Sequence, residues 1–179
     1  MKIEFRPIAE TDDVALLRDL FNHTPDFHGT TYKTAGMTDE EFAAWIKETI
    51  SYSDPKNVPA DRVPTTKLIL WIDDIPVARA DYRHWLTPTL EIVGGHVGYN
   101  VSSKHRGKKY AILNLAKALE YIRQHNPELK RVLITCNDEN IASWKTIEKN
   151  GGVLEKTYIV PEGHGKYSGC IERRYWVEL

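Results

Sequence analysis

Five residues that are basic, or become basic on protonation, crowd around one glycine in the stretch SSKHRGKKYAILNLAKA, residues 102–118. The glycine is Gly107, and the basic residues are Lys104, His105, Arg106, Lys108 and Lys109. A helix start presents unpaired backbone N–H groups and the positive end of the helix dipole. A glycine just before it lets a phosphate approach that backbone closely. The pattern predicts an anion site at a helix start, with a solvated basic loop as the alternative.

Such a site needs a strand before it and a helix after it. The stretch GGHVGYNVSS, residues 94–103, is typical of a strand, and its glycine pair indicates an irregular entry or a close backbone approach. Residues 108–125 place apolar side chains on one helical face and predict the clearest helix of the chain. These neighbours favour the anion site over the solvated loop.

The other elements follow from hydrophobic periodicity and turn residues. Thr11 is expected to cap a first helix, and Thr38 with Glu41 forms a capping box for a second. Asp73 and Asp74 predict a hairpin turn between two strands. Further strands are expected at 2–8, 65–72, 75–85, 131–136, 152–160 and 170–179, and helices at 11–23, 38–50 and 137–150.

The resulting order is β-α-α-β-β-β-α-β-α-β-β. It predicts an α/β fold with a mixed sheet and helices on both faces. The chain has 179 residues, of which 41% are hydrophobic. This is enough for a real core, and we expect one domain over residues 1–179.

Charge and composition exclude several classes of protein. The 24 Lys and Arg residues nearly balance the 25 Asp and Glu residues, so no global charge attracts nucleic acid or an anionic membrane. No stretch approaches the ~18 apolar residues of a membrane span. The start MKIEFRPIAETDD has no signal-peptide core. We expect a soluble, cytoplasmic protein with no nucleic-acid or membrane partner.

The cysteines and histidines form no metal pattern. Cys136 ends an apolar run and is expected to be a buried thiol, and neither it nor Cys170 belongs to a CxxC or Cys/His spacing. His23 and His28 lie in a predicted loop without zinc spacing. A cysteine nucleophile remains an alternative, although no motif places a base beside either thiol. We expect no metal cofactor.

Two motifs resemble those of the GNAT superfamily of acyl-CoA N-acyltransferases, and the resemblance covers nearly the whole chain. The segment RGKKYA, residues 106–111, resembles the family motif Arg/Gln-x-x-Gly-x-Gly/Ala. Asn140 with EKNG, residues 148–151, resembles the Asn that opens the family's next helix and its Glu-Lys-x-Gly ending. The wording GGHVGY with NIAS and IEKNGGVLE is similar to a bacterial subgroup known mainly as predicted acetyltransferases.

The resemblance implies the GNAT fold and an acetyl-CoA-dependent N-acetyltransferase. An acceptor amine would attack the thioester directly, within a ternary complex, with acetyl-CoA as co-substrate and no metal. In the family, the pantetheine arm lies between the splayed fourth and fifth strands, and the first motif cradles the pyrophosphate. The cofactor-binding residues that the resemblance implies are Tyr99, Asn100, Val101, Arg106, Gly107, Lys108, Lys109, Tyr110, Ala111 and Asn140. An ordinary helix-start residue is the alternative for Asn140.

This chain departs from the family pattern at two positions. Lys109 replaces the motif glycine, so its side chain either crowds the cofactor or pairs with a phosphate. At a positive φ it would be strained by about 1 kcal/mol or more. Ile147 stands where many members carry a tyrosine that protonates the departing thiolate. Water, or the hydroxyl of Ser143 on the same helix face as Asn140, is expected to serve instead.

The general base matters more than this acid. Deprotonating an ammonium at pH 7 costs about 4.6 kcal/mol, whereas expelling a thiolate costs about 2 kcal/mol. Glu91 and His96 flank the glycine pair, where family members often carry a catalytic carboxylate, and His84 ends the preceding strand. These three are the candidate bases, with a hydrogen-bonded structural role as the alternative for each histidine.

The acceptor is expected to be a small-molecule or peptide amine. Its site would lie between loops 22–37 and 52–64 and the turn 161–169, which hold Phe27, His28, Tyr32 and Tyr167. The terminal strand 170–179 is a candidate surface for pairing or packing in a homodimer. A GNAT-fold sensor or scaffold that binds acyl-CoA with weak catalysis is the alternative function.

Overall fold

The computed structural model describes residues 1–25 and 34–179 of the chain. The strands are β1 (Ile3–Pro7), β2 (Thr65–Ile72), β3 (Ile75–Arg83), β4 (Val97–Val101), β5 (Arg131–Asn137), β6 (Val153–Ile159) and β7 (Ile171–Glu178). The α-helices are α1 (Val14–Asn22), α2 (Asp39–Ser51), α3 (Pro88–Ile92), α4 (Tyr110–His125) and α5 (Ile141–Lys149). No helix within these two ranges is long and apolar enough to cross a membrane.

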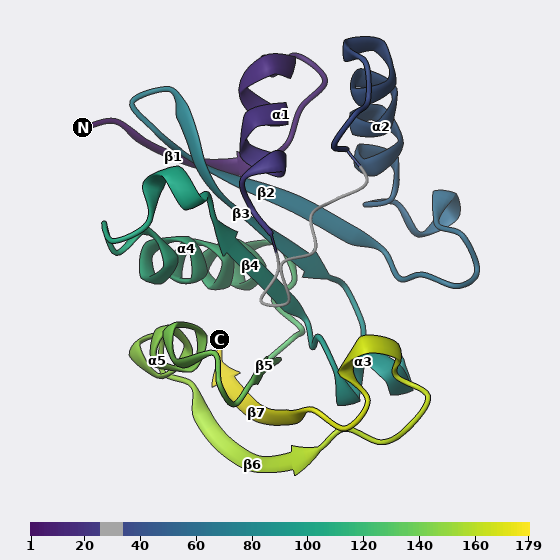
Figure 1. Ribbon diagram of the computed structural model, residues 1–179, viewed down its shortest axis with the longest axis vertical. Helices are drawn as coiled ribbons and strands as arrows, with labels where there is room; N and C mark the ends of the chain where they lie inside the picture. The colour runs from purple at the N-terminus through teal and green to yellow at the C-terminus, as the bar shows by residue number, and fades with distance from the viewer. Residues whose placement is uncertain (26–33) are drawn as a thin grey trace.

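The strands form two sheets, with the orders β1-β2-β3-β4 and β5-β7-β6 (Figure 1). The expected α/β class is confirmed, but the sheet is not mixed: each described strand pair is antiparallel. The β2–β3 hairpin turns at Asp73 and Asp74, whose φ angles are 49° and 64°. Two positive φ angles match the right-handed twist of the flanking strands, as the sequence predicts.

The terminal strand β7 lies in the middle of its sheet. It pairs with β5 over residues 172–178 and with β6 over residues 171–176, so both edges are occupied over residues 172–176. The expected pairing of this strand with a second copy is therefore wrong, because β5 and β6 occupy its two edges, whereas its packing in a homodimer stays a prediction.

Helices cover both faces of the first sheet. Figure 1 shows α1 and α2 on one face and α4 on the other. Along β2, Ile69 and Trp71 pack with α1 and α2, while the alternating Leu68 and Leu70 belong to the clusters on the α4 side. Burying an apolar side chain of this size contributes about 1.5–3 kcal/mol, so β2 anchors both layers.

Local capping decides where the helices begin. The capping box of Thr38 and Glu41 is present at α2, as predicted. The cap of α1 is Asp13, which accepts from the Leu16 backbone N–H at 2.9 Å. The prediction of Thr11 is wrong, because helical geometry starts only at Val14 and places the first free N–H groups beyond its reach.

The short helix α3 was not predicted. It begins where Thr87 accepts from the Leu90 N–H at 3.2 Å and Pro88 occupies the first helical position. A threonine cap followed by proline is a sequence signal for a helix start. The helix lies in the connection between β3 and β4, and the chain then passes through Gly94 and Gly95 into β4.

Among the described residues, backbone hydrogen bonds join the two sheets around Gly95. An isolated bridge joins Gly95 to Ile134, and the His96 backbone N–H donates to the Leu133 carbonyl at 2.7 Å. Beyond this joint, β4 pairs with β3 alone among the described strands, so β4 and β5 diverge. The divergence leaves the backbone of β4 accessible along one edge.

Candidate active site

A cavity of about 610 Å³ lies beside the diverging edge of β4 and the starts of α4 and α5. Its lining residues are Pro25, Tyr99, Asn100, Val101, His105, Arg106, Gly107, Lys109, Tyr110, Ala111, Ile112, Asn140, Ala142, Ser143 and Thr146. The residues implied as cofactor-binding all belong to this lining, except Lys108. Thr146 was missed, although it lies one helical turn after the candidate Ser143 and therefore on the same face.

The start of α4 has the geometry of an anion cradle. Lys109 precedes the helix in the left-handed conformation, with φ 62° and ψ 15°, and makes no side-chain cap. The N–H groups of Tyr110 and Ala111, in the first turn, have no helical acceptor. Gly107 has φ 79°, and an added Cβ would meet nothing within 4 Å, so conformation rather than crowding favours glycine there.

The residues of the basic cluster have two different roles: some attach the loop to α1, and others line the cavity. Lys104 forms an ion pair with Asp19 of α1, and the Ser103 N–H donates to the His23 carbonyl at 2.8 Å. Both contacts attach the loop before α4 to α1. Burial, together with Lys108, lowers the pKa of His105 and favours its neutral form. The cationic side chains left in the cavity lining are those of Arg106 and Lys109.

Substitutions at Lys109 separate backbone strain from charge. Lys109→Gly is expected to raise the free energy of unfolding by about 1 kcal/mol, because glycine adopts a positive φ freely. Lys109→Ala keeps the strain and is expected to change stability little. Both variants lose the ammonium and are expected to bind coenzyme A about threefold more weakly, as for an exposed ion pair. Chemical unfolding and calorimetric titration measure the two effects.

The difference in affinity is expected to shrink at high salt, because exposed charges are screened. If both variants bind coenzyme A with the affinity and salt dependence of the wild type, the Lys109 ammonium does not contribute to the site.

The start of α5 places hydroxyl groups in the cavity. Asn140 caps this helix by accepting from the Ser143 N–H at 3.2 Å, so it is a helix-start residue that also lines the cavity. The Tyr99 hydroxyl lies 3.0 Å from Ser143 Oγ. Ile147 is fully buried in the core and offers no polar group. Burial raises the pKa of the Cys136 thiol to about 12, which removes its thiolate and hence its nucleophilicity near neutral pH.

Hydrogen bonds constrain the candidate bases differently. His96 Nδ1 accepts from the Leu133 backbone N–H at 2.9 Å, and burial with the nearby Arg83 lowers the pKa of His96 to about 4. A neutral imidazole that accepts at Nδ1 carries its proton on Nε2 and has no second lone pair to offer. His84 lies 2.8 Å from Thr66 Oγ1 through Nε2, and Glu91 is exposed on α3.

A second cavity, of about 600 Å³, lies on the opposite side of the first sheet. It is lined by Trp45, Glu48, Thr49, Tyr52, Asp61, Arg62, Val63, Thr65, Lys67, Asp81, Arg83, Thr87, Thr89 and Leu90. The predicted loop 52–64 therefore contributes to a cavity, whereas the turn 161–169 does not line this one. Phe27, His28 and Tyr32 lie outside the described residues.

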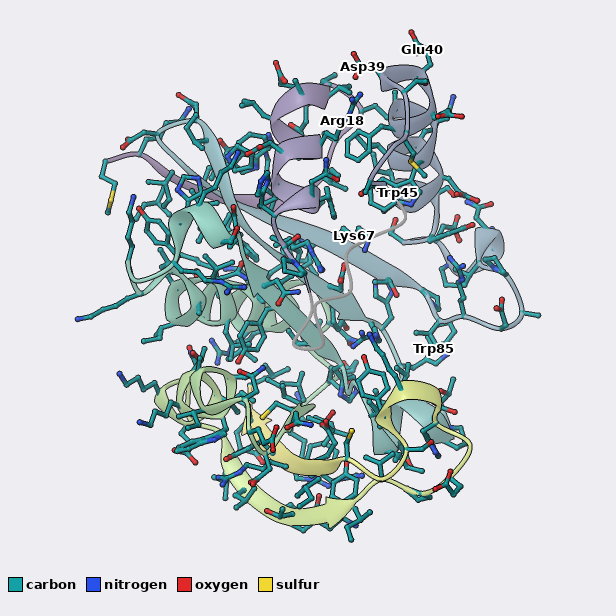
Figure 2. All side chains as sticks on the ribbon, in the orientation of Figure 1. Arg18, Asp39, Glu40, Trp45, Lys67 and Trp85 are labelled. Atoms are coloured by element: carbon teal, nitrogen blue, oxygen red, sulfur yellow. The ribbon has the colours of Figure 1, made fainter. Side chains whose placement is uncertain are left out.

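Charged groups form the floor of this second cavity. Asp81 is paired with Lys67 at 2.6 Å and with Arg79 at 2.8 Å. Burial alone would raise the pKa of Asp81, but the two cations hold it well below its usual range. Figure 2 shows Lys67 beneath Trp45 of α2, and its ammonium lies 6.0 Å from that ring centroid. The Asp81 carboxylate is therefore ionised, and it is paired with the side chains of Lys67 and Arg79.

Metal ligands do not gather in the described parts of the chain. Within residues 1–25 and 34–179, no group of three or more His, Cys, Asp or Glu side chains is arranged to hold an ion.

Solved structures of low sequence identity share this fold. A ribosomal-protein-S5-alanine acetyltransferase from Vibrio fischeri is 14% identical, with 99% of this chain and 93% of that chain covered and a TM-score of 0.70. RimL, a ribosomal L7/L12 α-N-protein acetyltransferase solved with coenzyme A, is 13% identical over 100% and 95% of the two chains, with a TM-score of 0.69. A spermidine N-acetyltransferase chimera from Vibrio cholerae and hSSAT is 12% identical over 99% and 96%, with a TM-score of 0.67.

Sequence comparison identifies the family directly. A search of curated protein sequences found no match. The family model described as an acetyltransferase (GNAT) domain matches residues 2–153, which include the diverging strand β4, the cradle at α4 and the start of α5. With this match over most of its length, the chain belongs to the GNAT family of acetyltransferases.

Proposed function

We propose that this acetyltransferase moves the acetyl group of acetyl-CoA to a primary amine, by direct attack of the amine on the thioester in a ternary complex. The observation that carries the proposal is the cavity of about 610 Å³, whose lining combines an open strand edge, two helix starts and the RGKKYA motif without Lys108. Coenzyme A has a pyrophosphate, which suits a helix start, and an amide-bearing arm, which suits an open strand edge.

In the proposed complex, Arg106, Lys109 and the free N–H groups of the first turn of α4 bind the pyrophosphate. The arm follows Tyr99, Asn100 and Val101 along β4 and reaches Asn140 at the start of α5. A backbone N–H of β4 stabilises the oxyanion that forms on the thioester carbonyl. Lys108 contributes charge from outside the cavity.

We propose the position of the coenzyme A sulfur from the Ser143 hydroxyl in the cavity lining. RimL was solved with its coenzyme A joined to a cysteine by a disulfide. In this chain, Cys136 of β5 lies close to Ser143, which lines the cavity. We place the coenzyme A sulfur beside Ser143, whose hydroxyl then donates to the departing thiolate.

The amine must lose a proton during attack. Glu91 and His84 are proposed as bases, because His96 has committed its only lone pair to β5. Neither residue lines a cavity itself, but each follows a residue of the second cavity, Leu90 and Arg83. Single replacements of Glu91, His84 and His96, with acetyl transfer measured against pH, separate them. A fall of tenfold or more identifies the base, and the absence of any such fall places it on another residue.

The acceptor is proposed to enter through the second cavity. This cavity reaches Asp81 on β3, which pairs in register with Gly98 on β4, one residue from Tyr99 of the cofactor cavity. An amine entering there would approach the thioester from the face of the sheet opposite α4. The protein acceptors of two neighbours and the spermidine of a third show that this fold serves several amines. We propose a cytoplasmic activity, where Cys136 and Cys170 stay reduced.

Calorimetric titration with acetyl-CoA at low and high salt tests the cofactor site. Salt-sensitive binding supports the pyrophosphate cradle, and the absence of binding overturns it. A panel of amines, including spermidine and alanine-ended peptides, then tests transfer. Binding with no transfer to any amine would favour an acyl-CoA sensor, for which the buried Ile147 is the structural argument.

A further inference from the structure

A phenol reaches the proposed sulfur site from the strand rather than from the helix. The Tyr99 hydroxyl lies 3.0 Å from both the carbonyl oxygen and Oγ of Ser143. Tyr99, Ser143 and Thr146 all line the cofactor cavity, and the Thr146 hydroxyl donates to the Ala142 carbonyl at 2.8 Å. Three hydroxyl groups from β4 and α5 therefore form one cluster on the cavity wall.

The helix itself provides no such phenol. Ile147, where many family members place a tyrosine, has no exposed surface and packs in the core cluster. The ring of Tyr99 packs against that same cluster, but its hydroxyl points to the Ser143 position. A tyrosine hydroxyl therefore lies at the start of α5, but it comes from Tyr99 on β4 rather than from the helix itself.

We propose that Tyr99 is a positioning residue for the acetyl-transfer reaction: by donating to the Ser143 carbonyl it fixes the start of α5 and so places the Ser143 hydroxyl beside the coenzyme A sulfur, where it stabilises the departing thiolate. This inference rests on the proposed function, because it requires coenzyme A in the cavity. Tyr99 donates its single proton to the Ser143 carbonyl, which ties the first turn of α5 to β4, and the Ser143 hydroxyl keeps its own proton to donate.

The step balances without ionising either hydroxyl. The amine nitrogen forms the new bond to the carbonyl carbon, the C–S bond breaks, and its electron pair stays on sulfur. The proton released by the amine goes to the base and then to solvent. Burial raises the pKa of Tyr99, so its phenol keeps its proton and acts as a donor throughout.

The bound thiol reports this hydrogen bond without any acceptor amine. The pKa of the coenzyme A thiol in the complex is measured from the ultraviolet absorbance of its thiolate, with the complex of desulfo-coenzyme A as the reference. We expect the bound thiol of the wild-type protein to titrate below the ordinary value of about 8.5. Tyr99→Phe and Ser143→Ala are each expected to raise that pKa by about one unit, with little further change in the double variant.

Tyr121→Phe is the matched control. Tyr121 packs, partly buried, against the same core cluster as Tyr99 but does not line the cavity. This variant is expected to leave the thiol pKa at its wild-type value. Tyr99→Phe keeps the ring and its packing, so a change in the thiol pKa reports the hydroxyl rather than the fold.

The possible failures are distinguishable. If Tyr99→Phe binds coenzyme A with wild-type affinity and an unchanged thiol pKa, the positioning role is overturned and the proposed function stands. If the wild-type protein does not bind coenzyme A, both are overturned. With an active amine in hand, the role further predicts a lower kcat in Tyr99→Phe at an unchanged KM for acetyl-CoA.

Discussion

Gly95→Ala is expected to lower the free energy of unfolding by about 3 kcal/mol or more, the largest loss among the substitutions considered. An added Cβ would lie 2.3 Å from the Leu133 carbonyl oxygen and 2.8 Å from its carbon. Both are backbone atoms of β5, held by the bridge between the sheets, so neither can move aside as a side chain would. The φ of 64° adds strain of about 1–2 kcal/mol for a residue other than glycine. Urea unfolding measures the loss.

Gly165→Ala is the matched control for this substitution. Gly165 has a φ of 58°, close to that of Gly95, but its added Cβ would meet nothing within 4 Å. It should show the conformational penalty alone, about 1 kcal/mol. Equal losses in the two variants would mean that the joint between the sheets adapts to a methyl group. A larger loss for Gly95→Ala, with weaker coenzyme A binding, is the expected result, because this joint sets where β4 and β5 diverge.

Glu172→Gln is expected to stabilise the protein by about 3 kcal/mol at pH 8 and to change its stability little at pH 4.5. Glu172 is 3% exposed on β7, where burial raises the pKa of its carboxyl from 4.5 to about 7 despite a hydrogen bond to Thr135. Between pH 4.5 and about pH 7, the Glu172 carboxyl is therefore protonated in the folded state and ionised in the unfolded state. Stability falls as pH rises through this window, by about 1.4 kcal/mol per unit.

Glutamine removes this titration while keeping a polar side chain of the same shape. Urea unfolding of the two proteins at pH 4.5, 6 and 8 should give curves that separate as pH rises. Glu178→Gln, at an exposed position on the same strand, is the control. Its unfolding free energy should follow that of the wild type at all three pH values. Parallel profiles for the wild type and Glu172→Gln would show that Glu172 is ionised in the folded protein.

Local features were predictable from a few adjacent residues. The capping box at Thr38, the hairpin at Asp73 and Asp74, and the helix end at Gly151, whose φ is 84°, each depend on contacts within about four residues. The strand-then-helix pattern around RGKKYA likewise predicted a helix start, and the structure starts α4 at Tyr110. The wrong prediction at Thr11 was also local, since the Asp13 carboxylate is an equally good cap acceptor and lies directly before the helix.

Contacts between distant segments were not predictable in this way. Lys104 was counted with the basic cluster, yet it pairs with Asp19, 85 residues away. Glu172 occurs in a strand rich in charged residues, and only the packing of β7 between β5 and β6 leaves its side chain 3% exposed. The sequence contains both carboxylates, but not the distances that decide their charge and partners.

The sequence by itself therefore determined the family, the element order and the segment that forms the anion cradle, because these depend on residue types at short spacing. Only the tertiary structure decided which of those residues share a cavity, where the two sheets separate, and that the hydroxyl of Tyr99 meets Ser143 across 44 residues. The physical reason is that hydrogen bonding and burial of such pairs depend on how helices and sheets pack, and packing is set by the whole core rather than by any one stretch.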